Sequence, residues 1–225
     1  GIGTDNVDFG AANRLGIKVS NTPDGPTTAV AESVVTCLLS LLRHLPQVND
    51  EMHQGIWKKR LGLSVKDLTI TIVGYGRIGR EVAKLLSLFG ANIQIVDPFL
   101  PKDFELPYNC LNLEEALASS DVLSLHSSGS DEIIGSKEFS RLKKGSYLLN
   151  AARGSLIDEN ALVSAIDSGI IAGAWIDTFR NEPYAGPLKN YPQVILTPHL
   201  ATYTRQCRLS MELEAAQNLI RDLGL

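Results

Sequence analysis

The stretch TITIVGYGRIGREVAKLL, residues 69–86, decides the fold of this 225-residue chain. Its first residues, Thr69–Val73, are β-branched and predict a buried strand. The strand runs directly into GYGRIG and then into a helix-like stretch. Gly74 would permit a tight turn, Gly76 would let the backbone approach a diphosphate, and Gly79 would let the helix pack close to the strand. The pattern therefore predicts a turn that binds a dinucleotide diphosphate on the free N–H groups of a helix N-terminus.

An acidic residue follows the next predicted strand. Asp97 comes directly after Asn92–Val96 and lies 18 residues past Gly79 (97 − 79). This is close to the spacing of about 20 residues expected for the acid that binds the adenosine ribose. A carboxylate there would repel a 2′-phosphate, which favours NAD over NADP. A tight structural turn and an unrelated strand-end aspartate are the plainer alternative, but strand, spacing, helix and acid agree.

The rest of the chain alternates short apolar runs with amphipathic stretches. This alternation, with little polar patterning in the strands, predicts an α/β fold with a doubly wound parallel sheet. The predicted strands are Ile17–Ser20, Thr69–Val73, Asn92–Val96, Val122–Leu125, Tyr147–Asn150, Ile171–Ile176 and Val194–Leu196. The predicted helices among them are Arg77–Leu88, Leu113–Ala118, Glu138–Leu142, Glu159–Ser168 and Thr204–Asp222.

Two segments do not fit this alternation. An apolar helix is predicted from about Thr28 to His44, with a second one starting at Pro46. The pair is too apolar to be a solvated linker, so we expect it to bury against the sheet, a second domain or a second subunit. Residues 1–21 hold a helix-like stretch, Asp8–Leu15, and one strand-like run, which is half of a βαβ unit. We therefore expect the chain to begin inside a domain.

Composition restricts the class of partner and the compartment. The formal net charge of −4 argues against nucleic acid or an anionic membrane as the main partner. No run approaches the roughly 20 apolar residues of a bilayer span, and no signal peptide is evident. The three cysteines, Cys37, Cys110 and Cys207, have neither metal-ligand nor disulfide spacing. We expect a cytoplasmic protein without a bound metal.

Three polar residues follow later predicted strands, where ligands bind in sheets of this kind. Arg153 offers a planar fork for a carboxylate, and His199 can pass a proton near neutral pH. Glu182 would orient the histidine and favour its charged form. Together they suit the reduction of a 2-keto acid. Taken singly, each has a plainer reading: a surface ion pair, a solvated loop carboxylate and an ordinary loop histidine.

At this point the sequence resembles a known family, the D-isomer-specific 2-hydroxyacid dehydrogenases. The resemblance extends from residue 1 to about residue 204. It rests on GIGTDNVD (1–8), NTPDGPTTAVAE (21–32), VGYGRIGREVA (73–83), SDVLSLH (120–126), KKGSYLLNAARGSLIDE (143–159), GAWIDTFRNEP (173–183) and LTPHLATYT (196–204). It implies a Rossmann-type NAD-binding domain, residues 23–203, with a remnant of a flavodoxin-like substrate domain in 1–22 and a helix leading back to it in 204–225.

The resemblance also assigns roles to single residues. Arg153 would bind the substrate carboxylate, His199 would be the acid/base, and Glu182 would be the partner of that histidine. Ile2 matches a more weakly placed contact of the family. The residues implied to bind NAD are Gly74, Gly76, Arg77, Ile78, Gly79, Asp97, His126, Ser127, Ala151, Ala152, Arg153, Asp177, His199 and Ala201.

The chain departs from the family pattern in places. The loop after His126 is shorter than usual, and LATYT follows His199 where GGST is commoner. Because most of the substrate domain is absent, we expect NAD binding with little catalysis from these residues alone. The predicted activity is hydride transfer between NAD and the C2 of a small 2-hydroxy or 2-keto acid, in a homodimer formed through helices 28–50. The alternatives are an NAD(H)-binding regulator or corepressor of the same fold and a dehydrogenase of another lineage.

Overall fold

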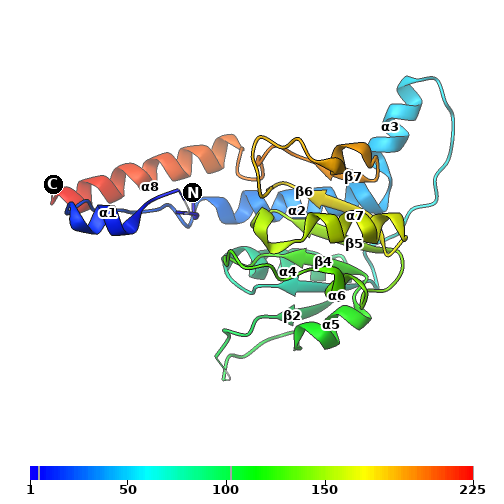
Figure 1. Ribbon diagram of the computed structural model, residues 1–225, viewed down its shortest axis with the longest axis horizontal. Helices are drawn as coiled ribbons and strands as arrows, with labels where there is room; N and C mark the ends of the chain where they lie inside the picture. The colour runs from blue at the N-terminus through cyan, green and yellow to red at the C-terminus, as the bar shows by residue number, and fades with distance from the viewer. Residues whose placement is uncertain (5, 102, 225) are drawn as a thin grey trace.

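A single parallel sheet organises the computed structural model, which describes residues 1–4, 6–101 and 103–224. Its strands lie in the order β3-β2-β1-β4-β5-β6-β7 (Figure 1). They are β1 (Thr69–Val73), β2 (Asn92–Val96), β3 (Asn109–Cys110), β4 (Val122–Leu125), β5 (Ser146–Asn150), β6 (Ile171–Ile176) and β7 (Val194–Leu196), and every pair in the described chain is parallel. The order reverses between β1 and β4, so the predicted doubly wound sheet is confirmed, with its switch point beside the glycine turn.

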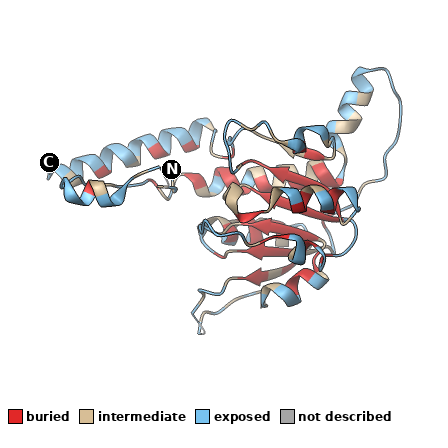
Figure 2. Cartoon of the chain, in the orientation of Figure 1, coloured by how far each residue is buried: buried red, intermediate tan, exposed pale blue. Residues whose placement is uncertain are grey.

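Helices cover both faces of the sheet, and each face has its own apolar core. The helices are α1 (Phe9–Arg14), α2 (Pro26–Leu42), α3 (Leu45–His53), α4 (Arg77–Leu88), α5 (Leu113–Ser119), α6 (Ser136–Phe139), α7 (Glu159–Asp167) and α8 (Arg205–Leu223), with 3₁₀ turns η1 (Gly154–Leu156) and η2 (Pro187–Asn190). One core joins the sheet to α2 and α4, and the other joins it to α5, α6 and α7. Burial on both faces explains the apolar strands, as Figure 2 shows.

Two sequence predictions need correction, and one strand was missed. Ile17–Ser20 is not a strand, because no strand of the described chain pairs with it. β3 was not predicted, since two residues at the edge of a sheet carry too little pattern to recognise. The helix predicted at Glu138–Leu142 is α6, which starts earlier, after Gly135, and ends at Phe139. Leu142 is buried beyond the end of that helix, so its apolar character reflects packing.

The apolar helix predicted from about Thr28 to His44 is α2, and its apolar character is explained by packing within this chain. Eight residues of α2 are buried, and α2 packs against α4 and β6. In the described chain no single helix could cross a membrane, although α2 and α3 together would pass on length and composition across a 62° bend. Large apolar side chains remain exposed on α3 and just after it, namely Leu45, Met52, Ile56, Trp57 and Leu61.

The first helix and the last lie side by side and extend away from the sheet (Figure 1). The side chain of Asn218 on α8 donates a hydrogen bond of 2.9 Å to the carbonyl oxygen of Asn21. Lys18 Nζ donates to the carbonyl oxygen of Asp222 nearby. Cys207 and Met211 pack against Ala29, which joins α8 to the start of α2. The described parts of segments 1–22 and 204–225 therefore contact each other away from the sheet.

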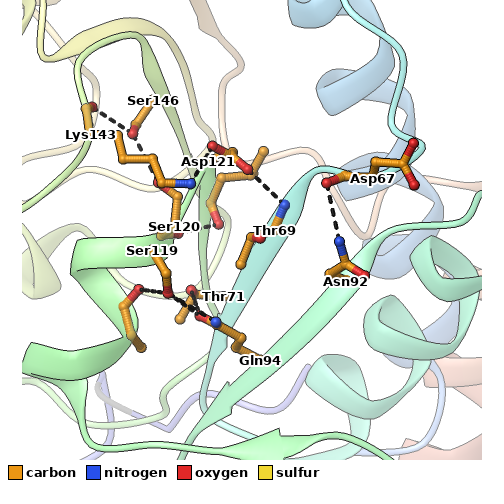
Figure 3. A network of polar contacts seen from close by, with 12 residues as sticks. Asp67, Thr69, Thr71, Asn92, Gln94, Ser119, Ser120, Asp121, Lys143 and Ser146 are labelled. Carbon is orange, nitrogen blue, oxygen red and sulfur yellow. Dashed lines mark hydrogen bonds and ion pairs between the residues drawn. The ribbon is translucent and has the colours of Figure 1, made fainter.

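Polar side chains tie the strands together at the amino end of the sheet (Figure 3). The Asp121 carboxylate accepts the N–H of Thr69 and pairs with Lys143 Nζ, each at 2.8 Å. Thr71 is fully buried, and its hydroxyl donates to Gln94 Oε1 at 3.3 Å. The Asp121 contacts satisfy polar groups at the end of the sheet opposite the glycine turn, and the Thr71–Gln94 bond satisfies polar groups at the centre of β1 and β2.

Candidate active site

The glycine turn has the geometry that a diphosphate requires. Gly74 has a φ of +95°, and a Cβ there would lie 2.7 Å from the backbone of His126, so only glycine fits. A Cβ on Gly76 would meet nothing within 4 Å, which leaves open space beside the start of α4. No side chain in the described chain caps that helix. Its first N–H groups therefore point to an open cradle that suits the diphosphate of a dinucleotide.

Asp97 lies beside this cradle at the end of β2. Its Oδ2 accepts the N–H of Tyr75 at 2.8 Å, and its Oδ1 accepts the N–H of Phe99 at 3.0 Å. Each oxygen keeps a second lone pair that can accept a hydroxyl proton. The turn itself therefore holds the carboxylate that the sequence predicts for the ribose.

A cavity of about 780 Å³, which we call the dinucleotide cavity, opens over the turn. Of the residues predicted to bind NAD, it is lined by Gly74, Gly76, Arg77, Ile78, Asp97, His126 and Ser127. Burial lowers the pKa of His126 to about 4, and its Nε2 lies 2.8 Å from Ser124 Oγ. The ring is therefore neutral at physiological pH. Arg77 forms an exposed ion pair of 3.4 Å with Asp24 in the segment before α2.

A second cavity of about 520 Å³, the catalytic cavity, adjoins the first. Ile2 and Ile78 line both cavities. The predicted residues in its wall are Ala151, Ala152, Arg153, Glu182 and His199. The structure thus brings together the side chains of Arg153, Glu182 and His199, the first and last of which are 46 residues apart in the sequence (199 − 153).

Glu182 and His199 form a hydrogen-bonded pair in this cavity. His199 Nδ1 lies 3.0 Å from Glu182 Oε2, and Glu182 Oε1 accepts the N–H of Phe179 at 2.9 Å. Burial alone would raise the pKa of Glu182, but the hydrogen bonds from Phe179 and His199 outweigh it and lower that pKa. The carboxylate is therefore charged near neutral pH and holds the imidazole by one nitrogen. The other nitrogen, Nε2, is left for a substrate.

A buried amide shapes the turn that carries Arg153. Asn150 at the end of β5 is fully buried. Its Nδ2 donates to the carbonyl oxygen of Arg153 at 2.9 Å, and its Oδ1 accepts the N–H of Ala152 at 3.0 Å. Arg153 Nη1 donates to the carbonyl oxygen of Ala152 at 2.8 Å. The guanidinium thus stands on a fixed backbone at the cavity wall.

Three predicted cofactor residues, Gly79, Asp177 and Ala201, line neither cavity. Gly79 packs α4 against the turn, and Asp177 and Ala201 are buried. Their direct contact with NAD stays a prediction. In this structure Gly79 allows α4 to pack against the turn, and Asp177 accepts hydrogen bonds from the N–H groups of Leu200 and Ala201. Sequence reasoning missed Thr178, which lines the catalytic cavity at 2% exposure with no hydrogen-bond partner for its hydroxyl in the described chain. Nothing in the sequence pattern around Thr178 indicated a role, because a single threonine hydroxyl is neither an acid nor a base near neutral pH.

Comparison with known proteins agrees with this geometry. Residues 35–201 match the model of the "D-isomer specific 2-hydroxyacid dehydrogenase, NAD binding domain". The chain belongs to this family. D-3-phosphoglycerate dehydrogenase of Archaeoglobus fulgidus is 35% identical over 98% of the chain and 44% of its own length. Glyoxylate reductase of Aeropyrum pernix is 36% identical over 97% of the chain and 70% of its own length.

A solved structure extends the comparison to three dimensions. The crystal structure of D-lactate dehydrogenase from Aquifex aeolicus, complexed with NAD and lactic acid, superimposes with a TM-score of 0.87 at 27% identity, over 99% of this chain and 74% of that one. By contrast, the chain spans less than half the length of the Archaeoglobus fulgidus D-3-phosphoglycerate dehydrogenase. NAD is the cofactor of the domain, and the open cradle at Gly76 fits its diphosphate.

Proposed function

We propose that this chain is the cofactor domain of an NAD-dependent oxidoreductase that acts on the C2 of a small D-2-hydroxy acid or 2-keto acid. The observation that carries the proposal is the Glu182–His199 pair, 3.0 Å apart, in the same cavity as Arg153. A carboxylate anchor and a proton-transfer group beside a dinucleotide cavity are the parts that this reaction needs.

The chain's residues divide the work. Arg153 binds the substrate carboxylate and so orients C2 toward the dinucleotide cavity. His199 Nε2 takes the hydroxyl proton during oxidation and returns it during reduction. The charged Glu182 stabilises the imidazolium that forms and holds the ring in place. Bound NAD supplies the hydride acceptor, and NADH supplies the donor.

The test replaces the histidine in the full-length protein. His199→Ala is expected to lower turnover of 2-keto acids by about 10²-fold or more, as for the loss of a general acid/base. NADH binding, measured by calorimetric titration, should be retained. His53→Ala on α3 is the matched control, because His53 is exposed and lines neither cavity. Normal turnover in His199→Ala would remove the residue from the mechanism.

A regulator or corepressor that binds NAD(H) is the competing function. It would require a protein partner whose affinity changes with NADH, and no turnover of any 2-keto acid. The presence of Arg153, Glu182 and His199 in one cavity weighs against a purely regulatory function. Family membership disfavours a dehydrogenase of another lineage.

We also propose the domain division 1–22, 23–203 and 204–225, with the two end segments belonging to a substrate domain. Its support is that these segments pack on each other away from the sheet (Figure 1), while Gly1, Ile2 and Gly3 line the catalytic cavity. A cytoplasmic protein remains our expectation, and its support is the scatter of the three free cysteines.

A homodimer is the proposed assembly, formed through helices 28–50. Since α2 is largely buried within the chain, the support comes from α3 and the residues after it, where Trp57 is 81% and Leu61 97% exposed. Apolar side chains this exposed are typical of an interface. Light scattering of the full-length protein should show a dimer at micromolar concentration, and a monomer there would contradict the proposal.

A further inference from the structure

A buried carboxylate grips the loop that carries the catalytic histidine. Asp177 follows β6 and has no exposed surface. Its Oδ1 accepts the N–H of Leu200 at 2.9 Å, its Oδ2 accepts the N–H of Ala201 at 3.0 Å, and its Oδ1 also accepts the hydroxyl of Thr197. Its carbonyl oxygen accepts the N–H of His199 at 2.9 Å. Every one of these donors belongs to the loop 197–201, on both sides of the histidine.

The hydrogen bond from Trp175 fixes which way the hydroxyl of Thr197 donates. Trp175 lies two residues before Asp177 on β6, is fully buried, and its Nε1 donates to Thr197 Oγ1 at 2.8 Å. An indole N–H can only donate, so Thr197 Oγ1 must accept there. The hydroxyl proton of Thr197 is then left for Asp177. The three side chains form a one-way chain of hydrogen bonds that ends on the carboxylate.

The loop needs such restraint because its backbone is strained. His199 has a φ of +51°, in the left-handed region that a residue with a Cβ adopts at a cost of about 1 kcal/mol or more. This conformation brings Nδ1 within 3.0 Å of Glu182. If the grip of Asp177 loosened, the backbone could relax and the ring would leave its partner.

We propose that Trp175, Thr197 and Asp177 form a hydrogen-bond relay that positions His199 against Glu182, with Trp175 and Asp177 buried and Thr197 partly buried between them. The relay makes all three of them positioning residues for the histidine loop. The inference rests on the proposed function, since it explains how the acid/base of that reaction is held. The inference goes beyond the proposed function because it assigns a positioning role to Trp175 and Thr197, which line neither the dinucleotide nor the catalytic cavity.

The decisive variants change Thr197 in the full-length protein. Thr197→Val keeps the shape but removes the hydroxyl, and Thr197→Ser keeps the hydroxyl. Thr28→Val, at an exposed position on α2, is the control for the chemical change itself. The readouts are kcat and KM for a 2-keto acid, the NADH dissociation constant by calorimetry, and the proton resonance of the His199 Nδ1–H in nuclear magnetic resonance spectra. Circular dichroism confirms that each variant is folded.

We expect Thr197→Val to lower kcat by about tenfold or more, as small misplacements of catalytic groups do. It should also shift or broaden the His199 Nδ1–H resonance and leave the NADH dissociation constant within about twofold. Thr197→Ser should restore both kcat and the resonance. Trp175→Phe removes the donor that orients the hydroxyl, so it should give an intermediate loss of kcat.

Other results would overturn the relay. Wild-type kcat and an unchanged resonance in Thr197→Val would show that the hydroxyl does not position His199. Equal losses in the Val and Ser variants would assign the effect to packing. A loss confined to NADH affinity would favour a cofactor contact by Asp177. If the wild-type protein turns over no 2-keto acid, the proposed function fails, while the resonance in the unliganded protein still tests the relay.

Discussion

The most informative perturbation adds a single methyl group at two glycines of the same turn. Gly76 and Gly79 are three residues apart, but the structure gives them different work. A Cβ at Gly76 would meet nothing within 4 Å. A Cβ at Gly79 would collide with the carbonyl oxygen of Gly74 and lie 3.2 Å from the Ile72 side chain. The two substitutions therefore separate the binding surface of the turn from its internal packing.

Gly76→Ala should leave folding intact and abolish tight cofactor binding. The φ of −76° at Gly76 is accessible to alanine, and the loss of unfolded-state freedom should stabilise the fold by about 0.4–1 kcal/mol. The new methyl group would fill the space that the diphosphate must enter. We expect NADH affinity to fall at least tenfold, or about 1.4 kcal/mol.

Gly79→Ala should lower both stability and affinity. Alanine is the better helix former by up to about 1 kcal/mol, but α4 would have to move away from Gly74. Overpacking of this kind costs about 1–3 kcal/mol, so we expect a net destabilisation of about 1–2 kcal/mol. The displaced helix would also carry its N–H groups away from the diphosphate.

Urea unfolding followed by circular dichroism measures the first quantity, and quenching or enhancement of NADH fluorescence measures the second. Gly10→Ala is the control for glycine replacement, because Gly10 lies in a helix, α1, has no positive φ and lines neither cavity. NADH affinity in Gly76→Ala equal to that of the wild type would refute the assignment of the turn. So would a Gly79→Ala protein of unchanged stability.

Three further outcomes can be checked. Asp158→Ala removes the cap of α7 and should lower the free energy of unfolding by about 1 kcal/mol in urea without changing NADH affinity; an unchanged midpoint would contradict it. Burial lowers the pKa of His126 from 6.5 to about 4, so between these pH values the unfolded chain binds a proton that the folded chain excludes. The free energy of unfolding should therefore fall by at most about 3 kcal/mol as pH drops from 6.5 to 4. His126→Asn should show a shallower fall between pH 7 and 5, and an equal fall would contradict this. Asp24→Asn frees Arg77 and should tighten NADH binding about two- to fivefold, an effect that should shrink in 0.5 M salt; no tightening at low salt would exclude competition between Asp24 and the diphosphate.

Much of the fold is readable from the chain because the signals are local. Glycines in GYGRIG, the apolar strands and the capping residue Asp158 each act within a few residues, and β1, β2, β4, β6, β7 and α4 lie where the pattern predicts. Short edge elements escaped prediction. β3 is two residues long, and the run at Ile17–Ser20 has strand composition without a neighbouring strand.

By itself, the sequence determined the strand–turn–helix unit, the acid at position 97, and the residue types that reach the site, because periodicity and glycine spacing are properties of neighbouring residues. Only the tertiary structure decided which of these side chains touch a cavity and which lie beneath it. Asp177 and His199 are 22 residues apart, yet the hydrogen bonds between their segments are made by β6 and β7 lying side by side. Such contacts depend on the order and register of the strands, which no local pattern of residues encodes.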